Sequence, residues 1–210
     1  MFRLYFFFQF LKNLLFYFFS EYKRYAQLLL IVFLKRPKSI VEIGVYKGKR
    51  SKELIEVAKI FNNKINYYGF DLFDLFNRKI DLKEFSKKPN SENDIKYKLS
   101  KLANVMLFKG FTYNTLPTFN KKIDLIFIDG GHSVKTIAND WHYVKKMMHK
   151  DTYVLFDDYY SNNKKIIRKF GCNNIIRELP DIYQSNVLPI KDKIKRLNNT
   201  KVQMVLVKKV

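Results

Sequence analysis

Carboxylates follow two apolar runs in the second half of the chain. Asp129 ends one run and is followed by Gly-Gly-His, and Asp157 and Asp158 end another. If the two runs are neighbouring strands, their ends lie about 4.8 Å apart, and three carboxylates converge on one hard cation. Because clustered carboxylates repel one another, a divalent metal or a bound positive ligand is the expected counter-charge. His132, with a near-neutral pKa, could take a proton from a substrate hydroxyl.

A second group of polar residues lies earlier in the chain. Glu42 precedes two glycines, Gly44 and Gly48. Gly44 would let a ligand approach the backbone, and Gly48 could open the next helix. This spacing is neither the three-glycine dinucleotide turn nor a P-loop. Asp71 ends the next apolar run, 27 residues after Gly44, where a carboxylate can accept hydrogen bonds from two ribose hydroxyls. The two features together indicate a ligand that contains adenosine.

Each of these residues also has a purely structural alternative. Asp71 could be a helix cap or a turn residue, as lone aspartates after strands often are. His132 and Ser133 could cap the helix that follows them, and Asp158 could cap the next one. The chemical interpretation therefore depends on whether the fold brings the groups together.

Short β-rich runs alternate with helical patterns from residue 39 onward, as in βαβ units around a parallel sheet. The pattern predicts strands at 39–45, 66–71, 105–109, 123–129, 152–157, 187–190 and 202–207. It predicts helices at 49–61, 94–102, 133–150, 163–170 and 174–179. Polar residues 73–93 form an expected insertion that could cover a site. We therefore expect an α/β domain with a doubly wound, mostly parallel seven-stranded sheet, whose ligands bind outside the carboxyl ends of the strands.

The first thirty-six residues are dense in Phe, Tyr and Leu and contain no glycine or proline. Charged and polar residues interrupt the first run, which is therefore a poor membrane-spanning segment. We expect two amphipathic helices that pack on the domain, form a homodimer face or lie on a bilayer as a peripheral contact. In the bilayer case the residues near lipid phosphates would be Lys12, Lys23, Arg24, Lys35 and Arg36. The expected division is a helical extension at 1–36 and a ligand-binding domain at 37–210.

The composition limits the remaining possibilities. The chain has 210 residues and a formal net charge of +21, which attracts anionic partners. The Lys, Asn, Ile and Phe bias runs along the whole chain, so we do not expect specific nucleic-acid binding. Cys172 is the single cysteine, which excludes an intrachain disulfide and suits a reducing cytoplasm. A cytoplasmic location, in contact with the inner face of the membrane if the extension binds lipid, is the expectation.

Four segments, taken in order, resemble the class I S-adenosylmethionine-dependent methyltransferases. They are VEIGVYKGKRS at 41–51, YGFD at 68–71, IDLIFIDGGHS at 123–133 and FDDY at 156–159. The branch they resemble includes macrocin O-methyltransferase and the cephalosporin-hydroxylase-like proteins. The resemblance implies the Rossmann-like methyltransferase fold, S-adenosylmethionine as cofactor and, in the sugar-modifying members, magnesium. The first segment lacks the middle glycine of the common methyltransferase form, and the aromatic extension lies outside the shared core.

Carried over residue by residue, the resemblance implies the following roles. The cofactor-binding residues are Glu42, Gly44, Tyr46, Lys47, Gly48, Asp71, Gly110, Phe111 and Asp129. Within this set, the first five surround the methionine part, Asp71 holds the ribose, and Gly110 and Phe111 lie near the adenine. The metal ligands are Asp129, Asp157 and Asp158, and the catalytic residues are His132 and Asp129.

The predicted activity is O-methylation of a sugar or another hydroxylated small molecule, with an anionic nucleotide or cell-surface glycan suiting the basic surface. Two rivals share the scaffold. A dehydrogenase that uses a nicotinamide cofactor is disfavoured because the three-glycine turn is absent. The other rival is a non-catalytic membrane-associated or nucleic-acid-binding module with a vestigial cofactor site. The presence of every acidic strand end argues against such decay.

Overall fold

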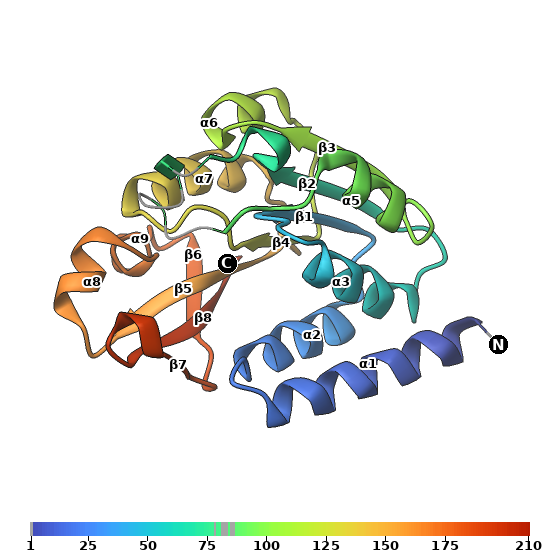
Figure 1. Ribbon diagram of the computed structural model, residues 1–210, viewed down its shortest axis with the longest axis horizontal. Helices are drawn as coiled ribbons and strands as arrows, with labels where there is room; N and C mark the ends of the chain where they lie inside the picture. The colour runs from blue at the N-terminus through green and yellow to red at the C-terminus, as the bar shows by residue number, and fades with distance from the viewer. Residues whose placement is uncertain (1, 78, 81–83, 85–86) are drawn as a thin grey trace.

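One eight-stranded sheet forms the centre of the computed structural model, which describes residues 2–77, 79–80, 84 and 87–210 (Figure 1). The strands are β1 (Ser39–Ile43), β2 (Asn66–Asp71), β3 (Asn104–Lys109), β4 (Leu125–Ile128), β5 (Tyr153–Ser161), β6 (Tyr183–Val187), β7 (Asp192–Ile194) and β8 (Thr200–Lys209). Their order across the sheet is β3-β2-β1-β4-β5-β8-β6, and β7 also pairs with β8.

The direction of the strands places a switch point at the centre of the sheet. Strands β1 to β5 are parallel, β8 is antiparallel to β5, and β6 and β7 are antiparallel to β8. β1 lies between β2 and β4, so the strand order reverses between β1 and β4. In β5 the register against β8 shifts between Phe156 and Tyr159, so Asp157 and Asp158 lie in an irregular part of the strand.

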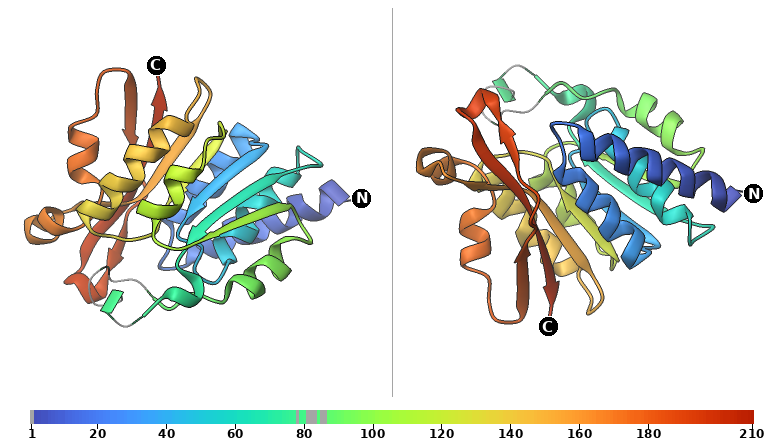
Figure 2. Two further views of the ribbon diagram at one scale, coloured as in Figure 1. Left: turned by 90° about the horizontal axis from the view of Figure 1, so that it is seen from above. Right: turned by 90° about the horizontal axis from the view of Figure 1, so that it is seen from below.

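Helices cover both faces of the sheet (Figure 2). They are α1 (Phe2–Phe19), α2 (Arg24–Lys35), α3 (Lys49–Lys59), α5 (Glu92–Leu99), α6 (Thr112–Thr115), α7 (Val134–Met147), α8 (Lys164–Lys169) and α9 (Asn173–Arg177). Side chains alternate between the faces of a strand: in β5, Leu155 packs in the core beneath α2, α3 and α5, and Phe156 packs in the core beneath α7 and α9. Both faces are therefore apolar, which explains the continuous apolar runs of β4 and β5.

The N-terminal extension forms two helices, as expected. α2 packs against the sheet and α3, with Leu28, Leu29 and Val32 fully buried. α1 lies outside α2 and α3 along the lower edge of the molecule in Figure 1, and it buries Phe6 and Phe10 against them. Packing on the domain is thus confirmed for one side of the extension.

The doubly wound α/β prediction is confirmed, and most element boundaries agree to within a few residues. The predicted strand at 187–190 is wrong, because β6 ends at Val187, the Leu188 amide donates the last hydrogen bond to β8, and Pro189 has no amide hydrogen to donate. β7 was not expected, because three residues that include Asp192 and Lys193 carry no apolar alternation. The predicted insertion at 73–93 lies partly outside the described residues. Its described start is a short 3-10 turn, η1 (Phe73–Leu75).

Candidate active site

The carboxyl ends of β1 and β4 meet at the switch point, and Gly44 makes their approach possible. The Asp129 amide donates to the Ile43 carbonyl at 2.8 Å. Gly44 has φ +94°, and a Cβ there would lie 2.0 Å from the Asp129 carbonyl oxygen. Only glycine tolerates this conformation and this contact. Gly44 therefore allows the backbones of the two strand ends to pack closely.

Asp71 ends β2 beside the loop that follows β1. Its Oδ2 accepts hydrogen bonds from the Val45 and Tyr46 amides at 2.8 and 2.7 Å, and its Oδ1 accepts from the Leu72 amide at 2.6 Å. Tyr46 has φ +53°, a left-handed conformation that these bonds help to hold. The structure therefore gives Asp71 a loop-ordering role at the predicted ribose position, and ribose contact stays a prediction.

Glu42 is fully buried beneath the N-terminus of α3. Its Oε2 accepts a hydrogen bond from the Ser51 hydroxyl at 2.5 Å and another from the Tyr67 hydroxyl. Its Oε1 has no hydrogen-bond partner, one of three such buried side-chain atoms in the described part of the chain. Burial raises the pKa of Glu42 from 4.5 to about 7. An unpartnered buried acceptor is costly, and a ligand ammonium, such as that of a methionine moiety, would satisfy it.

The other predicted cofactor residues lie on the same edge of the sheet. Gly48, with φ +69°, opens α3, and Lys47 is exposed beside it. Gly110 follows β3, and its amide donates to the Asp71 carbonyl at 2.9 Å. Phe111 is partly exposed, and its ring stacks on Tyr113 at a centroid distance of 5.1 Å. Loops after β1, β2 and β3 thus come together as the resemblance implies, with an exposed aromatic face on the predicted adenine side.

The carboxylate of Asp157 is paired with a cation from the N-terminal extension. Arg24, the first residue of α2, donates from Nε and Nη2 to the two oxygens of Asp157, both at 2.6 Å. Its Nη1 donates to Asp192 of β7 at 2.7 Å. Burial alone would lower the pKa of Arg24, but the charge and hydrogen bonds of Asp157 raise it well above its ordinary value. Arg24 is nearly fully buried, so its predicted position among lipid phosphates is wrong.

Asp158, the next residue of β5, has different partners. It pairs with Nδ1 of His132 and accepts a hydrogen bond from the Tyr160 hydroxyl at 2.9 Å. Burial alone would lower the pKa of His132, but the Asp158 charge raises it to about 9. At neutral pH the imidazole is therefore protonated in this arrangement. A general base would first have to pass that proton on, so the base role of His132 stays a prediction.

Asp129 lies between these two ion pairs. The Tyr25 hydroxyl is 3.2 Å from Oδ2 of Asp129 and 3.1 Å from Oδ2 of Asp157, and Arg50 lies over the Tyr25 ring at 3.6 Å. Burial, together with the charges of Asp157 and Asp158, raises the pKa of Asp129 well above its ordinary value. A proton held near Asp129 is thus favoured.

The three aspartates do not fit the predicted magnesium site. Asp157 and Asp158 lie at the irregularity of β5, and each is already paired with a cation of the chain, Asp157 with Arg24 and Asp158 with His132. In the described residues no group of three or more His, Cys, Asp or Glu side chains is placed to hold a metal ion. The magnesium prediction is not supported. The counter-charge that the sequence required is present, but the chain itself supplies it.

The described part of the predicted insertion reaches the same edge. The Glu84 carboxylate accepts hydrogen bonds from the Ser133 amide at 2.8 Å and the Thr136 hydroxyl at 2.9 Å, at the start of α7. The Asn90 amide donates to the Tyr46 carbonyl at 3.1 Å. The described part of the insertion therefore contacts both the loop after β1 and the start of α7, and its role as a cover over the site stays a prediction.

Sequence reasoning missed several residues of this edge, namely Arg24, Tyr25, Arg50, Ser51, Tyr67, Glu84 and Asp192. Arg24 had a detectable signal, because it is a charged residue at the start of an apolar helix while the acidic strand ends lack a cation. Asp192 gave none, since the short strand β7 was itself not predicted.

The chain belongs to a methyltransferase family. The family model described as "methyltransferase domain" matches residues 41–159, more than half of the chain. Together with the doubly wound sheet, this match makes the protein a class I S-adenosylmethionine-dependent methyltransferase, and the resemblance seen in the sequence is confirmed.

Solved structures of methyltransferases share the fold. The O-methyltransferase TomG from Streptomyces achromogenes, in complex with SAM, superposes with a TM-score of 0.58 at 14% identity and covers 88% of this chain and 78% of its own. An O-methyltransferase from Bacillus cereus in complex with SAH gives 0.58 at 15% identity, covering 87% and 79%. An rRNA methylase from Streptococcus thermophilus gives 0.59 at 12% identity, covering 89% and 96%. These likenesses show the fold alone, and the fold does not select the acceptor.

One relative is similar in sequence. An uncharacterized protein of Acanthamoeba polyphaga mimivirus is 29% identical over 132 residues, which are 60% of this chain and 54% of that protein. The chain thus spans about half the length of this relative. In the described ranges no helix has the length and apolar character needed to cross a bilayer.

Proposed function

We propose that the protein transfers the methyl group of S-adenosylmethionine to a hydroxyl oxygen of a sugar or another small hydroxylated acceptor. The observation that carries the cofactor part is the unpartnered Oε1 of buried Glu42 at the switch point, beside the ordered loop after β1. A methionine ammonium is the complementary donor. Oxygen is proposed as the methylated atom because two of the solved structures that share the fold are named O-methyltransferases.

The donor supplies a methyl group on a positively charged sulfur. In the transfer a C–O bond forms, the S–C bond breaks, the sulfur leaves as a neutral thioether, and the acceptor hydroxyl loses its proton. Asp129, at the end of β4, is the candidate to accept a hydrogen bond from the acceptor hydroxyl and to take its proton during the transfer. The His132–Asp158 pair lies next to it as the candidate proton relay. Much of the rate would come from holding donor and acceptor in line.

No metal enters this proposal, because Arg24 and His132 already compensate Asp157 and Asp158. An anionic acceptor, such as a nucleotide-linked sugar, suits the net charge of +21. Two copies in a homodimer and peripheral membrane contact are compatible with this activity, and neither is needed for it.

The cofactor part is tested by calorimetric titration with S-adenosylmethionine. Wild-type protein should bind it, and Asp71→Ala should weaken binding by roughly tenfold or more, since the loop loses two hydrogen bonds to a charged group. Asp74→Ala, three residues later and exposed, is the matched control and should bind as the wild type does. Absence of binding to the folded wild-type protein would reject the proposal.

The acceptor part is tested with methyl-labelled donor and a panel of nucleotide sugars, neutral glycans, hydroxylated aromatics and amines. Label recovered as a base-stable methyl ether, and lost in Asp129→Asn, supports transfer to a hydroxyl. Label recovered on nitrogen, or as a base-labile ester, would contradict it.

A further inference from the structure

The acidic strand ends are neutralised from within the chain, at the place where the sequence called for a cation. Arg24 is 7% exposed, and Asp157 and Asp192 are 2% and 5% exposed. A bidentate guanidinium–carboxylate pair of this kind has the short distances of charge-assisted hydrogen bonds. Both oxygens of Asp157 are occupied, so neither is available to a second cation at the same time.

We infer that Arg24 is the resident counter-charge of this edge, that it holds the place of a divalent cation, and that the N-terminal extension thereby completes the site. This inference concerns the site of the proposed function but does not need the methyl transfer to be correct. It predicts that the native protein excludes divalent metals and that removal of Arg24 opens a binding position for one. Asp157 and Asp192, which Arg24 holds, and Asp129, which shares the Tyr25 hydroxyl with Asp157, would then supply the oxygen ligands that hard cations prefer.

The test uses Mn²⁺ as the probe and measures bound metal by electron paramagnetic resonance, with no methyl donor present. Wild-type protein should bind no Mn²⁺ at this edge. Arg24→Ala should gain affinity by about tenfold or more over wild type, and the additional change Asp157→Ala should remove the gain. Lys23→Ala, an exposed neighbour, is the matched control and should behave as wild type does.

Arg24→Lys provides a second variant in case Arg24→Ala does not fold, since it keeps a cation but loses the bidentate geometry. Its gain in Mn²⁺ affinity over wild type should be smaller than that of Arg24→Ala, or absent. Binding of Mn²⁺ to the wild-type protein more tightly than about 1 mM, lost in Asp157→Asn, would overturn the inference. So would a folded Arg24→Ala protein with unchanged Mn²⁺ binding. Because S-adenosylmethionine is titrated separately, failure here is distinguishable from failure of the proposed function.

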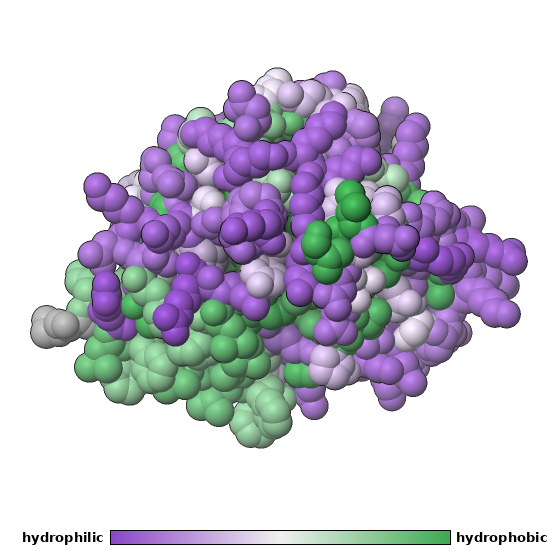
Figure 3. All heavy atoms as spheres, turned by 180° about the vertical axis from the view of Figure 1, so that it is seen from behind, coloured by the Kyte–Doolittle hydropathy of each residue, from purple (hydrophilic) through white to green (hydrophobic). Residues whose placement is uncertain are grey.

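A different observation concerns the outer side of α1. While Phe6, Phe10 and Tyr17 face the domain, a second apolar stripe faces outward at intervals of three and four residues, and its members are Leu4, Phe8, Leu11, Leu15 and Phe18. Phe8 and Phe18 are 58% and 63% exposed. Figure 3 shows the apolar surface gathered in one continuous area along the lower edge of the molecule, where α1 lies. Exposed apolar patches of this kind mark interaction sites.

Charge selects between the possible partners. The only charged residues of α1 are Arg3 and Lys12, both exposed, and the helix has no acidic residue. A second copy would bring one net charge of +21 against another, whereas an anionic bilayer would be attracted. An 18-residue helix that is about 27 Å long lies in the membrane plane with its apolar side in the acyl boundary.

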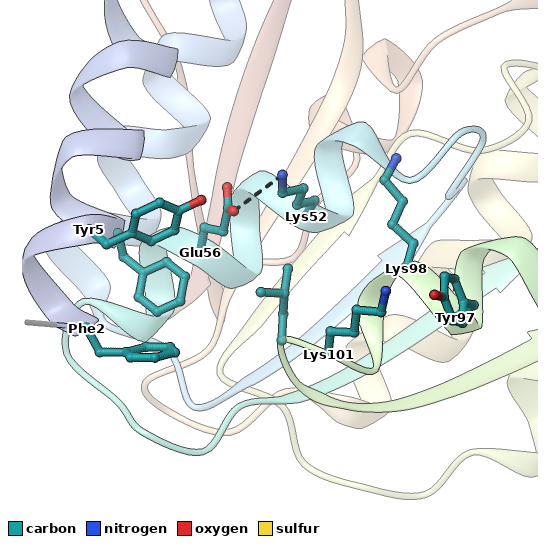
Figure 4. A pocket seen from close by; sticks show the side chains of 9 residues that line it. Phe2, Tyr5, Lys52, Glu56, Tyr97, Lys98 and Lys101 are labelled. Carbon is teal, nitrogen blue, oxygen red and sulfur yellow. Dashed lines mark ion pairs between the residues drawn. The ribbon is translucent and has the colours of Figure 1, made fainter.

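A cavity beside the N-terminal end of α1 also combines apolar and basic side chains. This cavity of about 670 Å³ lies between α1, α3 and α5 (Figure 4). Phe2 and Tyr5 lie on its apolar side, and Lys98 and Lys101 lie across from them, while Lys52 is ion-paired with Glu56 in the same lining. An apolar wall opposite ammonium groups suits an acyl chain with an anionic headgroup. The cavity contacts none of the predicted cofactor residues, so it is separate from the strand-end site.

We propose that the outer stripe of α1 docks the protein on an anionic lipid bilayer. Flotation with phosphatidylcholine vesicles, with and without phosphatidylglycerol, tests this proposal on the full chain. Wild-type protein should float only with the anionic vesicles. The triple variant Leu11→Ser, Leu15→Ser, Phe18→Ser should lose flotation. The control Met106→Ser, Ile182→Ser, Val187→Ser changes exposed apolar residues elsewhere and should keep it.

Deletion of the extension is not an informative variant, because it also removes Arg24. Sedimentation of the same variants tests the competing possibility that a second copy of the chain covers the stripe. A wild-type dimer that the α1 triple variant converts to a monomer would overturn the lipid proposal, because the stripe would then lie between two copies. Equal flotation of wild type and the α1 variant would overturn it as well.

Discussion

The two halves of the strand-end edge satisfy their carboxylates in opposite ways. In the β4–β5 half, Asp157 and Asp158 are each paired with a cation of the chain, Arg24 and protonated His132. In the β1–β2 half, Glu42 keeps one buried oxygen without a partner. The first half is internally complete, and the second lacks a donor that a ligand can bring.

This difference bears on function because the two halves flank the switch point. A balanced, buried ion pair gives rigidity and leaves little capacity to bind a further cation. An unpartnered acceptor costs free energy in the apoprotein and returns it when a donor binds. The cofactor is therefore expected on the β1–β2 side, and the charged network of β4–β5 is expected to shape the acceptor side.

The largest effect should come from breaking the β4–β5 half. Arg24→Ala leaves Asp157 and Asp192 without their cation, and removal of one partner of a buried pair costs about 3–5 kcal/mol. Urea denaturation should show that loss in the free energy of unfolding. Lys23→Ala should change it by less than about 0.5 kcal/mol, as exposed substitutions do. An equally small change in Arg24→Ala would show that the pair is not formed in solution.

Glu42→Gln alters the β1–β2 half, which lacks a donor, and its effect on stability is expected to depend on pH. The folded pKa of Glu42 is about 7, above 4.5 in the unfolded chain. Between these values the folded state holds a proton that the unfolded state has released, so the contribution of Glu42 to stability is full below pH 4.5 and is lost as the pH rises through 7. The loss amounts to roughly 3 kcal/mol.

The measurement is the free energy of unfolding of wild type and Glu42→Gln from about pH 5 to 8, across the window in which burial keeps Glu42 protonated. The wild type should fall relative to the variant as the pH rises. Glu178→Gln, at an exposed position, should run parallel to wild type. Parallel curves for wild type and Glu42→Gln would mean that Glu42 is ionised or solvated in the native state.

The sequence predicted the sheet and its acidic ends well because both depend on local signals. The runs that became β2 and β4 are apolar and end in Asp71 and Asp129, and the period and the flanking glycines identify them. The βαβ pattern predicted parallel strands with their carboxyl ends at one edge, whereas the pairing of β1 with β4 is seen only in the structure.

The partners of these carboxylates were not foreseeable in the same way. The Arg24–Asp157 pair joins residues 133 positions apart, and its formation depends on how α2 docks against the sheet. The prediction of a metal assumed that consecutive aspartates converge. The two residues instead lie at an irregularity of β5, and each is paired with its own cation, Asp157 with Arg24 and Asp158 with His132.

Gly44 connects the two halves, and Gly44→Ala should disturb both. The added Cβ would meet the Asp129 carbonyl at 2.0 Å, at a backbone φ of +94°, and such strain costs about 2 kcal/mol. Gly110→Ala is the matched control, because it has φ +140° and its nearest contact is a Thr115 methyl group at 3.3 Å. Thermal unfolding should show the greater loss in Gly44→Ala. Equal losses of stability in the two variants would mean that the positive φ alone, and not the close approach of β4, explains why glycine is needed at position 44.

The smallest effect should come from Tyr25→Phe, which removes one hydroxyl from the β4–β5 half and keeps the ring under Arg50. The hydroxyl contacts Asp129 and Asp157 and accepts a hydrogen bond from Arg24 at 3.1 Å. Loss of one such group should cost about 1 kcal/mol, and Tyr22→Phe, at an exposed site, should cost nothing measurable. A double-mutant cycle with Asp129→Asn then shows which carboxylate depends on the hydroxyl. Coupling near zero would place the Tyr25 hydroxyl with Asp157 alone and leave Asp129 free to receive the acceptor.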